Sequence, residues 1–245
     1  MGLFDRTKEL IGDIAMGRLN DVRVIVFGVG GVGSWCTECL VRTGIGHLTI
    51  VDCDMVDENN VNRQLMATVS TIGKFKVDVL RERLLDINPQ ADITALHERY
   101  SIETSSSFAL AGYDYVVDCI DSLDDKMHLI LETTKRSAAG QVVCSSPWLF
   151  SSMGAARKID PTRIRSAEFW KVSGCALARA LRNRMKREGL LPQAKFMCVY
   201  SDETPYVPQS QLTGSQGKGS LMQVTAAFGL TLASLVVNAL LKNGQ

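Results

Sequence analysis

Residues 21–33 read Asp-Val-Arg-Val-Ile-Val-Phe-Gly-Val-Gly-Gly-Val-Gly, an apolar run followed by a cluster of glycines. The apolar run predicts a strand over 21–27, and the residues from about 31 to 41 predict a helix. Glycine tolerates positive φ and close backbone approach, while a helix N-terminus offers free N–H groups to phosphate oxygens. This order of strand, turn and helix predicts a nucleotide-binding site at Gly28, Gly30, Gly31 and Gly33.

The remainder of the N-terminal part alternates between short β-branched runs and longer helical patterns. Strands are predicted at 47–52, 91–96, 115–120 and 141–144, and helices at 74–87 and 124–138. This alternation predicts an α/β fold, in which a Rossmann-like, doubly wound and mostly parallel sheet has helices on both faces. We expect residues 1–146 to form a nucleotide-binding unit. Residues 147–245 are expected to be a substrate-facing extension of the same structural domain, with a mobile loop at 201–220 and an apolar helix at 221–241.

Charge and cysteine content narrow the class of protein. The 245 residues include 27 Lys and Arg against 26 Asp and Glu, so no global charge indicates a polyanionic partner. The odd number of cysteines, 7, favours reduced thiols in a cytoplasmic protein over a disulfide framework. Residues 221–241 lack charge and reach the roughly 20 residues that a membrane-spanning helix needs. Their Gln, Thr, Ser and Asn residues favour a helix buried in the protein, with peripheral membrane contact as the alternative.

Charged and amide side chains follow the predicted glycine turn. Asp52 ends a predicted strand, where a carboxylate can accept the hydroxyl groups of a ribose. The following segments supply Asn59, Asn60, Asn62, Arg63, Lys76, Asp121 and Ser122. A hydride-transferring enzyme has little need for Arg63 and Lys76 near phosphates, whereas an enzyme that releases pyrophosphate must stabilise the charge that grows on it. Asp121 can hold Mg²⁺ at the carboxyl edge of a strand, so the expected cofactors are ATP and Mg²⁺. A redox or non-catalytic nucleotide-binding module is the alternative.

This ordered set resembles the ThiF/MoeB/HesA superfamily of ubiquitin-activating-like adenylating enzymes. The resemblance spans nearly the whole chain and includes the glycine turn, Asp52, the Asn-x-x-Arg-Gln run at 60–64, and Lys76. It implies that a homodimer activates a carboxylate as an acyl-adenylate, with Arg63, Lys76 and Asp121 in catalysis. It also implies that Arg6, six residues before Gly12, reaches the triphosphate of the neighbouring subunit.

Other stretches are similar to one subgroup, the tRNA threonylcarbamoyladenosine dehydratases. They are residues 42–46, residues 158–162, the basic helix, and residues 198–201 with 203–205. The subgroup adenylates the threonyl carboxylate of a modified adenosine beside the anticodon, and an internal nucleophile then closes a ring and releases AMP. Members commonly carry a glycine-rich turn where this chain has Ser-Ser-Pro-Trp-Leu-Phe at 145–150, so the details of the substrate pocket are not predicted.

A basic helix supplies the candidate surface for tRNA. The patch comprises Arg179, Arg182, Lys186 and Arg187, and Lys158, Arg163 and Arg165 are expected to extend it. Arg179, Arg182 and Lys186 fall on one helical face, which an ordinary solvated helix would also show.

Cysteine content bears on the alternative function. Members that activate sulfur carrier proteins often hold zinc with two Cys-x-x-Cys pairs. This chain has one such pair, Cys36 and Cys39, so no zinc is expected. The alternative is adenylation of the C-terminal glycine of a ubiquitin-like sulfur carrier protein, and a sulfur-relay protein is a further candidate partner. Cys175 and Cys198 are candidates for acyl transfer by position, but buried cysteine usually packs as a small apolar residue, and neither is assigned a role. We further expect Arg63→Ala and Lys76→Ala to leave the fold intact, as substitutions of exposed charges do.

Overall fold

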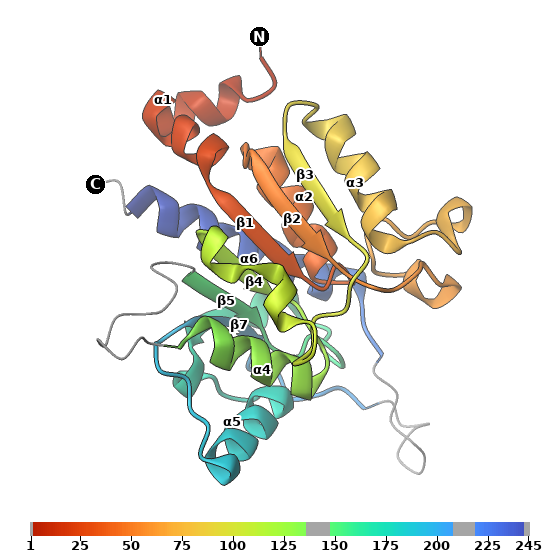
Figure 1. The fold of residues 1–245 in the computed structure, drawn as a ribbon. Helices are drawn as coiled ribbons and strands as arrows, with labels where there is room; N and C mark the ends of the chain where they lie inside the picture. The colour runs from red at the N-terminus through yellow and green to blue at the C-terminus, as the bar shows by residue number, and fades with distance from the viewer. Residues whose placement is uncertain (1, 136–147, 208–218, 243–245) are drawn as a thin grey trace.

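The computed structural model describes residues 2–135, 148–207 and 219–242, and these form one seven-stranded sheet (Figure 1). The strands are β1 (Arg23–Phe27), β2 (His47–Val51), β3 (Asp92–Leu96), β4 (Tyr115–Asp118), β5 (Trp148–Ser152), β6 (Ile164–Glu168) and β7 (Met197–Ser201). Their order in the sheet is β3-β2-β1-β4-β5-β7-β6, and only the β6–β7 pair is antiparallel. The predicted fold class, a doubly wound and mostly parallel α/β sheet, is confirmed.

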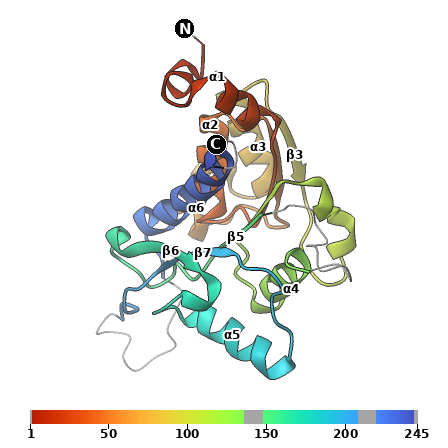
Figure 2. The ribbon, with the colours of Figure 1, turned by 90° about the vertical axis from the view of Figure 1, so that its left-hand side faces the viewer.

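Helices cover both faces of this sheet (Figure 2). They are α1 (Asp5–Asp21), α2 (Gly33–Thr43), α3 (Lys76–Ile87), α4 (Leu123–Thr133), α5 (Ala176–Glu188) and α6 (Met222–Lys242). Alternate residues of β1 enter two separate cores, because successive side chains of a strand point to opposite faces. Val24 and Val26 pack with α2, α3 and α6, while Ile25 and Phe27 pack on the side of α4 and α5.

Helix α6 packs closely against α2. A Cβ on Gly229 would lie 2.4 Å from the Val32 carbonyl oxygen, so only glycine permits this approach. The buried face of α6 includes Val224, Phe228 and Leu232. The helix is long and apolar enough to cross a membrane, yet half of its most apolar window is buried inside the protein. The predicted helix at 221–241 is therefore confirmed as a helix that packs on the core.

The predicted elements of the N-terminal part match the structure closely. The strands expected at 21–27, 47–52, 91–96 and 115–120 are β1 to β4, each shortened by one or two residues. Three predicted parts lie outside the described residues. They are the strand expected at 141–144, the central part of the loop expected at 201–220, and the end of the helix expected at 124–138. Strands β5, β6 and β7 and helix α1 were not predicted. All three strands belong to the same sheet as β1 to β4.

Candidate nucleotide-binding and adenylation site

The glycine turn between β1 and α2 has a backbone that other residues cannot adopt. Gly28 has φ +83°, and a Cβ there would lie 2.9 Å from the Cys119 carbonyl oxygen. A Cβ on Gly33 would lie 1.9 Å from the carbonyl oxygen of Gly28 itself. The turn is also bonded to the neighbouring strand, because the Gly28 N–H donates to the Val51 oxygen at 2.8 Å. Only glycine therefore fits at positions 28 and 33, because the backbone of the turn packs directly against other backbone atoms. Phosphate-binding turns have the same property.

Helix α2 begins directly after the glycine turn, and no side chain caps its N-terminus. Val32 occupies the N-cap position and its side chain makes no capping hydrogen bond. Ser34 instead donates its hydroxyl to the Gly30 carbonyl oxygen at 2.6 Å, which stabilises the turn from inside the helix. An uncapped N-terminus carries partial positive charge and free N–H groups, so it suits a phosphate.

Asp52, expected at the ribose, lies directly beside the glycine turn. One carboxylate oxygen accepts the Val29 N–H at 2.9 Å, and the other accepts the Asp54 N–H at 2.9 Å. Burial raises the pKa of Asp52, while the positive charge of Lys76 and these two N–H donors oppose that rise. The turn, Asp52 and Lys76 are therefore neighbours in space, as the sequence predicted.

Lys76 begins α3 and is buried, with only 5% of its surface exposed. Its ammonium lies 2.7 Å from Asp54 Oδ2, and Asp54 is itself largely exposed. The expectation that Lys76 is an exposed charge was wrong. Its aliphatic stem packs in the protein, so replacement by alanine removes packing as well as charge.

Arg63 lies beside Gly31 of the turn. A Cβ on Gly31 would lie 3.4 Å from Arg63 Cγ. The guanidinium donates to the Asn59 carbonyl oxygen at 2.8 Å and to Asn62 Oδ1 at 2.9 Å. Trp35 on α2 donates its indole N–H to the Arg63 carbonyl oxygen at 3.1 Å, which fixes the backbone against α2. A second cationic side chain is thus positioned next to the glycine turn.

The three asparagines before Arg63 differ in environment. Asn59 and Asn60 lie in a short 3-10 turn, Glu58–Asn60, that Asp57 caps. Asn60 is buried, and its side-chain oxygen accepts the Asp57 N–H at 3.1 Å as part of that cap. Asn62 donates to the Ser220 oxygen at 3.1 Å and so joins this segment to the residues before α6. Asn60 therefore shapes the segment, while Asn59 and Asn62 orient Arg63.

Gln64 ends the Asn-x-x-Arg-Gln run at 60–64, but it was not predicted as a site residue. It is 6% exposed, and its Oε1 is buried without a hydrogen-bond partner among the residues that the structure describes. A Cβ on Gly30 would lie 3.7 Å from Gln64 Nε2, so the amide faces the turn. An unpaired buried amide is unfavourable unless a ligand completes it. Together with the glycine cradle, it fits a polar group such as a nucleotide.

Asp121 and Ser122 lie in the loop between β4 and α4. Asp121 is exposed, and Ser122 caps α4 by accepting the Asp125 N–H at 3.5 Å. The same loop carries Cys119, whose carbonyl oxygen meets Gly28. The described ranges contain no group of three or more His, Cys, Asp or Glu side chains that could hold a metal by themselves. A single carboxylate fits Mg²⁺ that also takes phosphate oxygens and water, which is the usual Mg²⁺ site in nucleotide enzymes.

Comparisons with known proteins identify the family of this chain. The model of the ThiF family matches residues 4–245. The tRNA threonylcarbamoyladenosine dehydratase of Bacillus subtilis (strain 168) is 37% identical over 241 residues, which cover 96% of this chain and 91% of the relative. The chain belongs to the ThiF family.

Two crystal structures of the Escherichia coli tRNA N6-threonylcarbamoyladenosine dehydratase, TcdA, resemble this ThiF-family chain over its length. The complex with AMP has a TM-score of 0.86 at 32% identity and covers 98% of this chain and 95% of that one. The complex with ATP also has a TM-score of 0.86 at 32% identity, with 98% and 94% covered.

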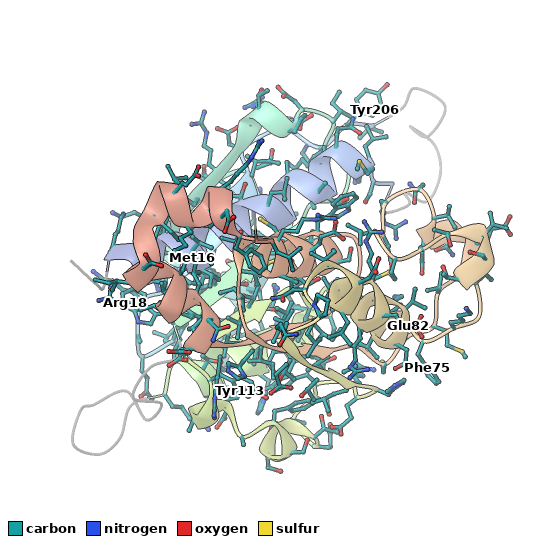
Figure 3. All side chains as sticks on the ribbon, turned by 90° about the horizontal axis from the view of Figure 1, so that it is seen from above. Met16, Arg18, Phe75, Glu82, Tyr113 and Tyr206 are labelled. Carbon is teal, nitrogen blue, oxygen red and sulfur yellow. The ribbon has the colours of Figure 1, made fainter. Side chains whose placement is uncertain are left out.

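Arg6 of this ThiF-family chain is far from the site on its own subunit. It is exposed near the start of α1, which leads into the beginning of β1, whereas the glycine turn follows the end of that strand. Figure 3 shows Met16 and Arg18 of α1 on one side of the molecule and Phe75, the residue before Lys76, on the other. The structure therefore does not bring Arg6 together with Arg63 and Lys76 in one subunit.

The basic helix, α5, uses part of its charge internally. Arg182 donates to the carbonyl oxygens of Phe169, Trp170 and Val172, the shortest distance being 2.8 Å to Val172. Lys186 Nζ lies 5.7 Å from the centre of the Trp170 ring. Arg179 and Arg187 are exposed. The basic patch on α5 stays a prediction, and within it Arg182 also holds the residues before α5 in place.

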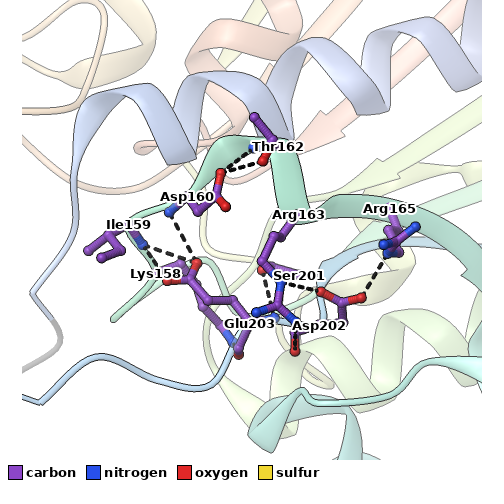
Figure 4. Close-up of polar contacts among 9 residues, drawn as sticks. All are labelled: Lys158, Ile159, Asp160, Thr162, Arg163, Arg165, Ser201, Asp202 and Glu203. Carbon is purple, nitrogen blue, oxygen red and sulfur yellow. Dashed lines mark hydrogen bonds and ion pairs between the residues drawn. The ribbon is translucent and has the colours of Figure 1, made fainter.

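The three residues expected to extend the basic patch instead form polar contacts with the end of β7 (Figure 4). Lys158 is 3% exposed and donates to the Glu203 carbonyl oxygen, and burial lowers the pKa of Lys158. Arg163 and Arg165 each donate to Asp202 at 2.8 Å. These contacts join the region of residues 158–165 to residues 202 and 203. Both regions overlap stretches that are similar to the dehydratase subgroup. Lys158 was wrongly expected at the surface.

The candidate cysteines are buried or partly buried. Cys36 lies in the core and Cys39 is partly buried beside it on α2, and burial raises the pKa of both thiols. Cys175 and Cys198 are buried, and burial raises the pKa of Cys198 well above its usual value. A protonated thiol inside the core is a poor nucleophile.

Proposed function

We propose that this chain is an ATP-dependent enzyme that adenylates the threonyl carboxylate of tRNA-borne threonylcarbamoyladenosine and then dehydrates it to a cyclic base. Full-length similarity to dehydratases of that name supports the substrate. The ATP and AMP complexes of the similar structures support the nucleotide. The observation that carries the proposal is the pair of cations at the glycine turn. Arg63 lies beside Gly31, and the charge of Lys76 acts on Asp52, which accepts a hydrogen bond from the turn.

In the first step, a carboxylate oxygen attacks the α-phosphorus of ATP, and pyrophosphate leaves with the electrons of the broken P–O bond. Negative charge grows on the leaving group, and Arg63 and Lys76 are placed to stabilise it. The N–H groups at the start of α2 hold phosphate oxygens, and Asp52 accepts a ribose hydroxyl. Asp121 would hold Mg²⁺, which supplies charge to the phosphates. Asn59 and Asn62 keep the Arg63 guanidinium oriented.

In the second step, a nucleophile within the modified nucleoside attacks the activated carbonyl carbon and AMP leaves. The ring closes with net loss of water, because the carboxylate oxygen departs with AMP. No thiol of the protein is needed, and the burial of Cys175 and Cys198 argues against acyl transfer to either.

We place the tRNA on the side formed by the described residues 148–207 and 219–242. Strands β5 and β7 end at the same sheet edge as β1 and β4, because all four run parallel, so the extension borders the nucleotide site. The exposed cations Arg179, Lys186 and Arg187 supply contacts to phosphates, and Arg182 holds the shape of this surface.

We further propose a homodimer that forms through α1. Leu3, Leu10 and Ile14 on or before this helix are 72%, 84% and 77% exposed, which is unusual for apolar residues of one short segment. A partner subunit that covers them would also bring its Arg6 toward a site that Arg6 cannot reach in its own chain. We place the enzyme in the cytoplasm. Contact with a membrane or with a sulfur-relay protein would use surface that this dimer leaves exposed.

The test is pyrophosphate release by the purified chain with ATP and Mg²⁺, measured separately with tRNA that carries threonylcarbamoyladenosine and with sulfur carrier proteins. We expect release with the modified tRNA, and none with the same tRNA lacking the modification. Release only with a carrier protein would contradict the proposed substrate while keeping adenylation. Binding of NAD(H) without binding of ATP would contradict both.

A further inference from the structure

A fully buried ion pair lies beneath the loop that carries Asp121. Asp118 is the last residue of β4, and Lys126 lies in the first turn of α4. Both side chains are 0% exposed, and Lys126 Nζ lies 2.7 Å from Asp118 Oδ2. Burying two opposite charges adds little net stability, because desolvation offsets most of their attraction. Apolar residues would fill this volume equally well, so the pair needs another explanation.

Two further hydrogen bonds of the pair are made with one residue of the loop, Ile120. The Ile120 N–H donates to Asp118 Oδ1 at 3.0 Å, and the Ile120 carbonyl oxygen accepts from Lys126 Nζ at 2.9 Å. Ser151 on β5 donates its hydroxyl to Asp118 Oδ2 at 2.6 Å. The pair therefore fixes both backbone polar groups of Ile120, and it is itself held by three elements of the fold.

Fixing Ile120 fixes the residues on either side of it. Cys119 precedes it, and the Cys119 carbonyl oxygen lies where a Cβ on Gly28 would be only 2.9 Å away. The Cys119 N–H donates to the Phe27 oxygen at 2.8 Å. Asp121 follows Ile120 directly. The ion pair thus determines how the Cys119–Asp121 segment meets the glycine turn.

We propose that Asp118 and Lys126 are positioning residues that hold this loop, and with it Asp121, at the phosphate end of the nucleotide site. This inference rests on the proposed function, in which Asp121 acts on magnesium-bound ATP. A loop displaced by about 1 Å is expected to slow adenylation by about 100-fold, since catalysis depends steeply on position. The same displacement would leave the rest of the sheet unchanged.

The experiment compares two variants with a matched control in the full-length protein. Asp118→Asn/Lys126→Met removes both charges and retains similar volume, and Ser151→Ala removes one donor to Asp118 while keeping the pair. Glu38→Gln is the control, because Glu38 is a buried carboxylate paired with Arg83 at 2.6 Å on the α2–α3 side of the sheet. The measurements are hydrogen exchange of the backbone at residues 119–122 without nucleotide, and kcat with the Mg²⁺ concentration for half-maximal AMP formation.

We expect the double variant to exchange faster at Ile120, to lose about 100-fold in kcat and to need more Mg²⁺, with Ser151→Ala intermediate and Glu38→Gln unchanged. A folded double variant with wild-type exchange and kcat would overturn the proposal, and so would equal losses in the control. If the double variant does not fold, wild-type exchange and Mg²⁺ dependence in Ser151→Ala would overturn it. Wild-type protein that releases no pyrophosphate would instead contradict the proposed function, while the exchange result would still test the positioning.

Discussion

The ammonium of Lys76 lies 2.7 Å from Asp54 Oδ2, so the lysine expected to meet the triphosphate already has a carboxylate partner in the protein without nucleotide. Asp54 also donates its backbone N–H to Asp52, the residue expected at the ribose. One short segment, 52–54, therefore connects the residue expected at the ribose with the residue expected at the triphosphate. The Lys76 side chain is buried, while the Asp54 side chain that it meets is largely exposed.

Lys76→Met is expected to lose about 100-fold or more in AMP formation, because it removes a cation that stabilises the leaving pyrophosphate. Methionine retains most of the buried stem, so we expect the midpoint of thermal unfolding to change by only a few degrees. Asp54→Asn removes the same ion pair but keeps the ammonium, and it should retain activity. Equal losses in the two variants would show that Lys76 acts through Asp54 and not on ATP. Single-turnover AMP formation and differential scanning fluorimetry measure both effects.

Gln64→Met is expected to weaken ATP binding by about tenfold, which corresponds to one lost hydrogen bond of about 1.4 kcal/mol. The same change should leave the free energy of unfolding unchanged or slightly higher, because it removes an unpaired buried oxygen. Isothermal titration calorimetry and urea unfolding provide the two numbers. Unchanged ATP affinity would mean that the Gln64 amide does not face the nucleotide.

Gly33→Ala is expected to disrupt the phosphate-binding turn, because the new Cβ would lie 1.9 Å from the Gly28 carbonyl oxygen. A shift of the turn should lower both thermal stability and ATP affinity. Gly112→Ala is the matched control, since no atom lies within 4 Å of its Cβ position. The two proteins can be compared by unfolding with and without ATP–Mg²⁺. Equal behaviour of the two variants would contradict the close approach at Gly33.

Asp202 should give a pH-dependent contribution to stability. Hydrogen bonds from Arg165 and Arg163 hold the pKa of Asp202 below its usual value. A carboxylate whose pKa is lower in the folded state stabilises the fold above its unfolded pKa, about 3.9, and this contribution is lost as pH falls through the lowered value. The difference in unfolding free energy between wild type and Asp202→Asn should be constant near neutral pH and shrink below about pH 4. A difference that grows in acid would contradict this assignment.

Arg6 can be tested by subunit complementation. Arg6→Ala and Asp121→Ala are each expected to be inactive as homodimers. A mixed dimer places one intact Arg6 beside one intact Asp121 site, so it should recover activity at one of its two sites. Tandem purification with two tags isolates the mixed dimer for assay. No recovery in a stable mixed dimer would exclude the contact between subunits.

The sequence predicted strands β1 to β4 because the signals for them are local. The glycine turn requires glycine at positions 28 and 33 for reasons of backbone geometry alone, and the alternating runs before residue 121 each form an element on their own. Strand β6 (Ile164–Glu168) gave no comparable signal, because it lies at the edge of the sheet and none of its residues is fully buried. Its place beside β7 comes from an antiparallel pairing, such as Ile164 with Ser201, which no local pattern contains.

The environment of the charged residues was the least predictable feature. Lys76, Lys126 and Lys158 look alike in the sequence, yet all three are buried, with partners 22, 8 and 45 residues away. Lysine is rarely fully buried, so only the fold reveals these pairings. Gln64 was predictable as a site residue, because it directly follows Arg63 in the Asn-x-x-Arg-Gln run that indicated phosphate chemistry.

The most direct test of the central claim measures pyrophosphate, AMP and the cyclised nucleoside together, from one reaction of ATP–Mg²⁺ with tRNA that carries threonylcarbamoyladenosine. For the wild-type chain we predict equal amounts of all three products, and for folded Arg63→Ala we predict the loss of all three. Cyclised nucleoside formed without pyrophosphate, or wild-type product formation by Arg63→Ala, would contradict an adenylation step driven by cations at the glycine turn.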